Sequence, residues 1–263
     1  MRIVMLGHSG AGKTSYMASM YALMNRGVDG FRVVAEADDD RMLRETAGAI
    51  RRGRYPYASA QRGSFDLVLR YAGADVLPFT WVDYRGATLT ERVRTSRAAR
   101  DLHADLDSAS GILLFHDARG LLTDPAAPRN VAAFTGLLHR ALDARRDRLT
   151  PLAIVVTKAD LVDFHTPAVR ARLRDPFTPI IDAVSRTLHV QGAFMLVSCG
   201  PLAIGVRVPA LWMLHLGILN RALEPASPEA TTPGADQGET ARIRSLVEPA
   251  ERLGDLLTHV QRF

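Results

Sequence analysis

The chain has 263 residues, of which 47% are hydrophobic and 23% charged, so it can bury the core of one large α/β domain or two small ones. Its net charge of +5 comes without a dense basic block, which argues against a nucleic-acid-binding protein. A single cysteine excludes an intramolecular disulfide, and because we find neither a signal peptide nor an apolar run long enough to span a bilayer, we expect a cytoplasmic protein.

The first motif is GHSGAGKT, which lies between a strand-like apolar run at Arg2 to Leu6 and a helical segment at Ser15 to Met24. Its glycines let consecutive backbone N–H groups face phosphates, and the N-terminus of the helix adds partial positive charge. The Lys13 ammonium is placed to reach the β- and γ-phosphates, and the Thr14 hydroxyl to ligate Mg²⁺. We therefore expect a nucleotide site whose phosphate-binding residues are Ser9, Gly10, Ala11, Gly12, Lys13, Thr14 and Ser15.

The next segments also have strand or helix character. Phe31 to Ala37 reads as an extra strand, and Asp38 to Gly53 as a helix because acidic residues open it and basic residues precede its closing glycine. Ser64 to Tyr71 and Leu77 to Tyr84 can pair as a hairpin.

The second half of the chain contains the strand type of parallel sheets. Gly111 to Ala118 and Pro151 to Asp160 are continuous apolar runs, with a helix between them at roughly Asn130 to Arg148. A last strand at Gly192 to Gly200 precedes a helix at Val208 to Leu223. This alternation predicts an α/β fold with a mainly parallel sheet and helices on both faces.

Three further motifs end strands. In VDYRG, the Asp83 carboxylate would hold Mg²⁺ and the Gly86 N–H would meet the γ-phosphate. In TKAD, which begins at Thr157, the Asp160 carboxylate can accept hydrogen bonds from N1–H and N2 of guanine, a donor pair that adenine lacks, while the stem of Lys158 lies along the purine. In SCG, which begins at Ser198, the Cys199 N–H can bond guanine O6.

In their order and positions, GHSGAGKT, DYRG, TKAD and SCG resemble the motifs of Ras-like small GTPases of the P-loop class. The resemblance covers roughly Met1 to Leu223 and implies a domain that binds GTP, GDP and Mg²⁺ and works with a protein effector or activating partner. The spacing is looser than in a minimal small GTPase, with extra sequence before Ser59 and at Leu161 to Gln191. The chain resembles a bacterial relative of this class, one of the GTPases that work beside separate effector proteins in multi-component systems.

The chain departs from the family pattern in both switch regions. The first switch lacks the family's Mg²⁺-binding threonine, and Ser59 is the expected substitute, with Ser64 as the second choice. Ala87 stands where the family has a water-orienting glutamine, and Ser9 where it has a glycine, so we expect slow hydrolysis. Arg85, within the second switch, can stabilise transition-state charge together with Lys13 and Gly86, although a plain surface arginine remains the alternative.

The C-terminal region differs in composition from the rest. Residues 1–223 form the expected GTP-binding domain, residues 224–240 a flexible linker, and residues 241–263 an amphipathic helical tail that we expect Pro249 to interrupt. The tail must cover its apolar side against the domain or against a partner. Its apolar residues at helical spacing are Ile243, Leu246, Val247, Leu253, Leu256, Leu257, Val260 and Phe263.

Two alternatives to a hydrolysing switch remain open. The first is a scaffold that holds GTP without turnover and assembles a complex, which Ser9 and Ala87 favour. The second is an ATP-using P-loop kinase or ATPase, against which the TKAD motif argues.

Overall fold

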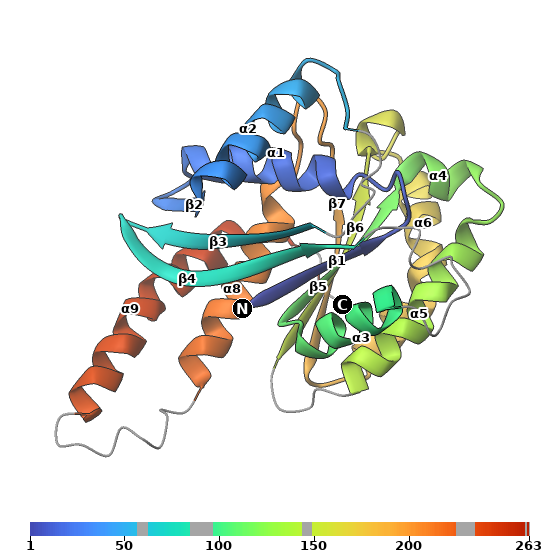
Figure 1. The fold of residues 1–263 in the computed structure, drawn as a ribbon. Helices are drawn as coiled ribbons and strands as arrows, with labels where there is room; N and C mark the ends of the chain where they lie inside the picture. Colours follow the sequence, from blue (N-terminus) through green and yellow to red (C-terminus); the bar gives the residue numbers. More distant parts are fainter. Residues whose placement is uncertain (57–62, 85–96, 144–148, 225–234, 261, 263) are drawn as a thin grey trace.

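The computed structural model describes residues 1–56, 63–84, 97–143, 149–224, 235–260 and 262. Seven strands in these residues form one sheet in the order β2-β3-β4-β1-β5-β6-β7 (Figure 1). The five strands from β4 to β7 in this order run parallel, β3 pairs antiparallel with β4, and β2 pairs antiparallel with β3, so only β3 runs against the direction of the others. The strands are β1 (Arg2–Gly7), β2 (Phe31–Ala35), β3 (Gly63–Tyr71), β4 (Ala74–Asp83), β5 (Gly111–Asp117), β6 (Thr150–Thr157) and β7 (Val190–Leu196).

Helices cover both faces of the sheet, as the alternation of strand and helix signals predicts. One face carries α1 (Lys13–Arg26), α2 (Ala37–Arg51), α8 (Arg207–Leu223) and α9 (Ala235–Leu256). The other carries α3 (Arg97–Ser108), α5 (Ala127–Asp143), α6 (Pro167–Arg174) and α7 (Thr178–Ser185), and the short α4 (Ala118–Thr123) follows β5. In this described part of the chain, no helix combines the length and apolar character needed to cross a bilayer.

The sheet separates two hydrophobic cores because successive side chains of a strand point to opposite faces. In β1, Ile3 and Met5 pack in the core beneath α1 and α8, whereas Val4 and Leu6 pack in the core beneath α3 and α5. A strand buried on both faces needs apolar residues at every position, which explains the continuous runs in β1, β5 and β6.

The extra strand and helix expected before the first switch are present as β2 and α2. The hairpin between β3 and β4 is present too, but its turn is tighter than predicted, because Tyr71 pairs directly with Ala74. The two turn residues, Ala72 and Gly73, both have positive φ, of 49° and 89°. This conformation matches the twist of a two-residue hairpin, so β4 begins at Ala74 rather than at Leu77.

The C-terminal tail lies on the chain's own domain. Helix α9 packs along α8 and reaches β4, and the two helices are neighbours at one end of the sheet (Figure 1). Leu246, Ala250, Leu253 and Leu257, at successive helical turns, are at most 6% exposed and join the core beneath α1 and α8. Of the two docking sites left open by the sequence, the structure shows the intramolecular one.

The helix boundaries of the tail differ from the sequence expectation. Helix α9 begins at Ala235, within the expected linker, and continues through Pro249 without interruption. Proline removes one backbone hydrogen bond from a helix, a cost that burial of the helix's apolar side offsets here. Outside the helix backbone, the Tyr71 hydroxyl donates to Glu248 Oε1 at 2.7 Å, next to the proline.

We expect Leu253→Ala to lower the free energy of unfolding by at least about 2 kcal/mol, because Leu253 is 0% exposed between α9 and the domain. Val247→Ala is the matched control, since Val247 lies on the same helix but is 43% exposed. Urea denaturation measures the free energy of unfolding of both variants. Equal stabilities would show that α9 leaves the domain in solution, and so would unchanged stability after deletion of residues 241–263.

Candidate functional site

The first motif forms the loop between β1 and α1. Gly7 and Gly12 let the loop backbone approach β5 and β6 closely. A Cβ on Gly7 would lie 2.6 Å from the Phe115 carbonyl oxygen, and one on Gly12 would lie 3.2 Å from Thr157 Oγ1. Gly12 also has a φ of 84° and immediately precedes the first residue of α1. The loop is thus held against the ends of β5 and β6, with the N-terminus of α1 as a possible anion site.

Lys13 is buried at the start of α1, with 7% of its surface exposed. Its Nζ donates to the Gly7 carbonyl oxygen at 2.8 Å and lies 4.0 Å from Asp83 Oδ1. Burial lowers the pKa of Lys13 and raises the pKa of Asp83, and each charge partly offsets the effect of burial on the other. The arrangement holds a cation beneath the loop, where an anionic ligand would stabilise its charge.

Thr14 and Asp83 form an oxygen pair that suits Mg²⁺. Thr14 Oγ1 donates to Asp83 Oδ2 at 3.2 Å, and among the described residues the buried Asp83 Oδ1 has no hydrogen-bond partner. Mg²⁺ favours such hard oxygen donors and commonly combines one or two of them with phosphate and water. The third expected ligand, Ser59, lies outside the described residues, and Ser64 is an exposed residue of β3.

The TKAD and SCG motifs meet at the carboxyl ends of β6 and β7. The Ala159 N–H donates to the Val197 carbonyl oxygen at 3.1 Å, and the Ser198 hydroxyl donates to Asp160 Oδ1. Thr157 Oγ1 lies 2.8 Å from the Ala11 carbonyl oxygen, which ties this end of the sheet to the phosphate loop. The hydroxyl of Ser198 therefore fixes the carboxylate that the sequence assigns to the base.

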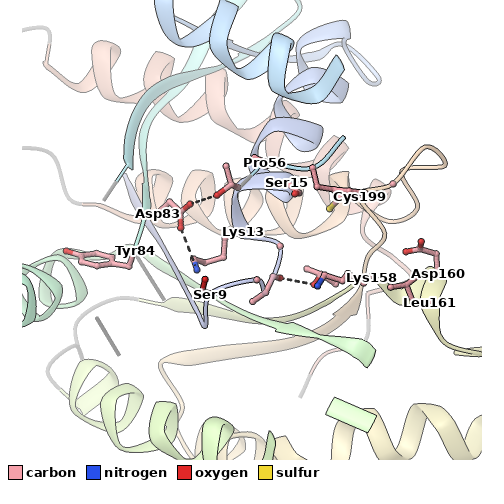
Figure 2. Close-up of a pocket in the computed structure, with 17 residues that line it drawn as sticks. Ser9, Lys13, Ser15, Pro56, Asp83, Tyr84, Lys158, Asp160, Leu161 and Cys199 are labelled. Atoms are coloured by element: carbon pink, nitrogen blue, oxygen red, sulfur yellow. Dashed lines mark hydrogen bonds and ion pairs between the residues drawn. The ribbon is translucent and has the colours of Figure 1, made fainter. Parts of the chain in front are cut away.

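One cavity of about 560 Å³ joins these groups. Figure 2 shows Lys13 and Asp83 at one end of it and Lys158 with Asp160 at the other. This volume is within the usual range of small-molecule sites. Ser198 supports the wall through Asp160, and the predicted residues Arg85 and Gly86 lie outside the described residues. The lining residues are Ser9, Gly10, Ala11, Gly12, Lys13, Thr14, Ser15, Tyr55, Pro56, Asp83, Tyr84, Thr157, Lys158, Asp160, Leu161, Cys199 and Gly200.

A family model described as Double-GTPase 1 matches residues 4–164, more than half of the chain. The chain belongs to the double-GTPase 1 family. Membership of a GTPase family implies guanine-nucleotide binding, in agreement with the cavity and with the motifs that line it. No protein among the curated ones matches the chain.

One solved structure supports the Ras-like fold of this double-GTPase, and two others align less well. The Arl6 BBS3 small GTPase of Trypanosoma brucei, solved with bound GppNp, aligns with a TM-score of 0.51 at 13% identity, over 84% of this chain and 98% of that one. The SRb-GTP/SRX signal recognition particle receptor complex of Chaetomium thermophilum aligns with a TM-score of 0.46 at 14% identity, over 75% of this chain and 90% of that one. The bacterial selenocysteine-specific elongation factor EF-Sec aligns with a TM-score of 0.47 at 15% identity, over 85% of this chain. This chain spans only 29% of that factor.

Several residues that line the cavity of the double-GTPase were not predicted from its sequence. Tyr55 and Pro56 lie just before the first switch, and a Cβ on Gly200 would lie 3.3 Å from the Tyr55 hydroxyl oxygen. The sequence YPY between two polar stretches was the available signal for an aromatic wall. Tyr84, at the end of β4, is anchored by a hydrogen bond from its hydroxyl to Asp105.

Cys199 and His116 provide no side-chain acid or base. Burial, reinforced by the charge of Asp160, raises the pKa of the Cys199 thiol to about 12, which leaves the backbone N–H as its expected contribution. Burial lowers the pKa of His116 to about 3, and its ring packs 5.0 Å from that of Phe177. His116 is therefore neutral and part of the core, as its place in a buried strand predicts. Burial also lowers the pKa of His8.

Proposed function

We propose that this double-GTPase is a cytoplasmic, Mg²⁺-dependent guanine-nucleotide switch that hydrolyses GTP slowly unless a partner protein completes its site. The observation that carries the proposal is the position of Asp160. Its carboxylate lines the cavity opposite the phosphate loop, and the Ser198 hydroxyl holds one of its oxygens. A fixed carboxylate at this position can accept the two hydrogen bonds that guanine donates and adenine does not.

The proposed roles divide along the cavity. The loop from Ser9 to Ser15 binds phosphate, with Lys13 as its buried cation, and Thr14 and Asp83 hold Mg²⁺ together with Ser59. The ion would neutralise phosphate charge when bound. At the other end, Thr157, Lys158 and Asp160 enclose the base, and Ser198 and the Cys199 N–H complete this wall.

Slow hydrolysis follows from the residues around the terminal phosphate. Ser9 lines the cavity where Ras-like GTPases have a glycine, and Ala87 cannot orient water as a glutamine does. In this proposal Lys13, Arg85 and the Gly86 N–H stabilise the transition-state charge, and a partner supplies what is missing.

The proposed switch depends on how the cavity connects to the two switch segments. Pro56 lines the cavity just before residues 57–62, and Tyr84 lines it just before residues 85–96. A nucleotide in the cavity would thus contact the chain at the start of both segments. A partner that binds these segments would distinguish GTP from GDP.

A scaffold that binds GTP without turnover is the second candidate, favoured by Ser9 and Ala87. It differs from the switch in one measurable property, the release of phosphate. A switch releases phosphate faster when its native partner is added, whereas a scaffold releases none with or without the partner.

Competition against a fluorescent GDP analogue tests the proposed binding. We expect GTP and GDP to displace it at concentrations at least about 100-fold lower than ATP, because adenine leaves the Asp160 carboxylate without donors. Removing Mg²⁺ with EDTA should weaken GTP binding, since Thr14 and Asp83 would lose the cation between them and the phosphates. Equal displacement by ATP and GTP would contradict the guanine assignment.

A further inference from the structure

The Lys158 ammonium forms an ion pair that the nucleotide-binding motifs do not predict. It donates to Asp117 Oδ2, at the carboxyl end of the neighbouring parallel strand. Asp117 pairs in register with Thr157, the residue before Lys158, so the backbones of β5 and β6 fix the two partners side by side. The ion pair is thus part of the sheet edge on which the cavity lies.

The Asp117 carboxylate is held in place by the helix that follows it. Its other oxygen, Oδ1, accepts hydrogen bonds from the N–H groups of Arg119 at 2.9 Å and Gly120 at 3.2 Å, which caps the start of α4. One oxygen therefore caps the helix while the other binds the lysine. This division fixes the direction in which Asp117 presents its charge.

Lys158 lies between two hollows. It lines the nucleotide cavity and also a smaller hollow of about 250 Å³, which Asp117 and Asp124 line. Both hollows are also lined by Ser9, Gly10 and Ala11, so the phosphate loop and Lys158 separate them. Of these two hollows Asp117 lines the smaller one, and its bond to Nζ directs the Lys158 ammonium towards that side.

We propose that Asp117 is a positioning residue for guanine-nucleotide binding, which orders Lys158 before the nucleotide arrives. This inference rests on the proposed function. A free lysine side chain loses conformational entropy when it becomes ordered, because its long stem has many rotamers. An anchored Lys158 has already lost that freedom, so its stem forms a preformed wall for the base and slows nucleotide release.

Asp117→Asn separates the two roles of the carboxylate. The amide oxygen can still cap α4, because asparagine is as good a helix cap as aspartate, but the amide N–H₂ now faces the ammonium and cannot bind it. We expect a fluorescent GDP analogue to dissociate about three to ten times faster, the change given by ~1 kcal/mol for a half-buried ion pair. Unchanged thermal stability would show that the cap is intact.

Asp124→Asn is the matched control. Asp124 lines the same small hollow and accepts a backbone hydrogen bond from Ala126 at 2.8 Å, and its hydrogen-bonding role resembles the capping role of Asp117. The ammonium of Lys158 binds Asp117, so Asp124→Asn should leave the release rate unchanged. Equal acceleration by Asp124→Asn and Asp117→Asn would mean that general charge around the loop sets the rate, which would overturn the inference.

A double-mutant cycle tests whether Asp117 acts through Lys158. Lys158→Met keeps an apolar stem and removes the ammonium, so adding Asp117→Asn to it should change the release rate no further. The inference fails if Asp117→Asn releases the GDP analogue at the wild-type rate, or if it accelerates release equally in both backgrounds. The proposed function fails separately, if the wild-type protein does not prefer GDP to ADP.

Discussion

Lys13→Ala is expected to weaken GTP and GDP binding at least about 1,000-fold, the change that a loss of ~4 kcal/mol produces. The Lys13 ammonium is buried and donates to the Gly7 carbonyl oxygen. Its partner of opposite charge is the Asp83 carboxylate, which lies 4.0 Å away. Without it, the phosphates would meet that carboxylate with no buried cation between them. Isothermal titration with GTP and Mg²⁺ measures the loss.

Lys13→Arg should not restore binding. The Lys13 Nζ sits 2.8 Å from the Gly7 carbonyl oxygen, in a space bounded by the loop backbone, and a planar guanidinium is too large for this position. Arg26→Ala is the control, because it removes an exposed charge from the other end of the same helix and should leave GTP affinity unchanged. Normal GTP binding by Lys13→Arg would contradict the proposed phosphate cradle.

The parts of the fold that the sequence predicts correctly depend on local patterns. Residues of β1, β5 and β6 are apolar at nearly every position because both faces of these strands are buried. Helix α2 has three aspartates in its first turn and ends in arginine, a charge order that a helix dipole favours by itself. Such signals need no knowledge of distant residues.

The parts that the sequence does not predict depend on contacts between distant residues. Helix α9 passes through Pro249 because its buried leucines dock on α8, an effect that a local rule about proline does not include. The region at Leu161 to Gln191 appears in the sequence only as extra length, but it contains α6 and α7, which complete one core.

The same distinction applies to the site. The four motifs could be assigned individually, since each ends a strand or begins a helix. The pairing of Lys158 with Asp117 joins residues 41 positions apart, and the Tyr55 hydroxyl lies beside Gly200, which is 145 positions further along the chain. Ser59, Arg85 and Gly86 lie outside the described residues, and their roles stay predictions.

Asp160→Ala is expected to weaken GTP binding about 30- to 1,000-fold, which corresponds to a loss of ~2–4 kcal/mol for a charge-assisted hydrogen-bond pair. The Ser198 hydroxyl holds the Asp160 carboxylate at the end of the cavity proposed for the base. Removing this carboxylate leaves both the N1–H and the N2 amino group of guanine without an acceptor. The affinity for ATP should change little, because adenine offers this carboxylate no such pair of donors. The variant should therefore bind the two nucleotides with similar, low affinity.

Asp160→Asn tests the same contact by reversing its hydrogen-bond pattern. The amide N–H₂ can donate to the second carbonyl oxygen of xanthine, where guanine presents an amino group, so xanthosine triphosphate should bind this variant better than GTP does. Asp163→Asn is the control, since Asp163 is exposed three residues further along the chain and should leave both affinities unchanged. Competition against a fluorescent GDP analogue in the wild type, and against its xanthosine counterpart in Asp160→Asn, measures both preferences. If Asp160→Ala binds GTP as tightly as the wild type, Asp160 does not contact the base, and the guanine assignment is wrong.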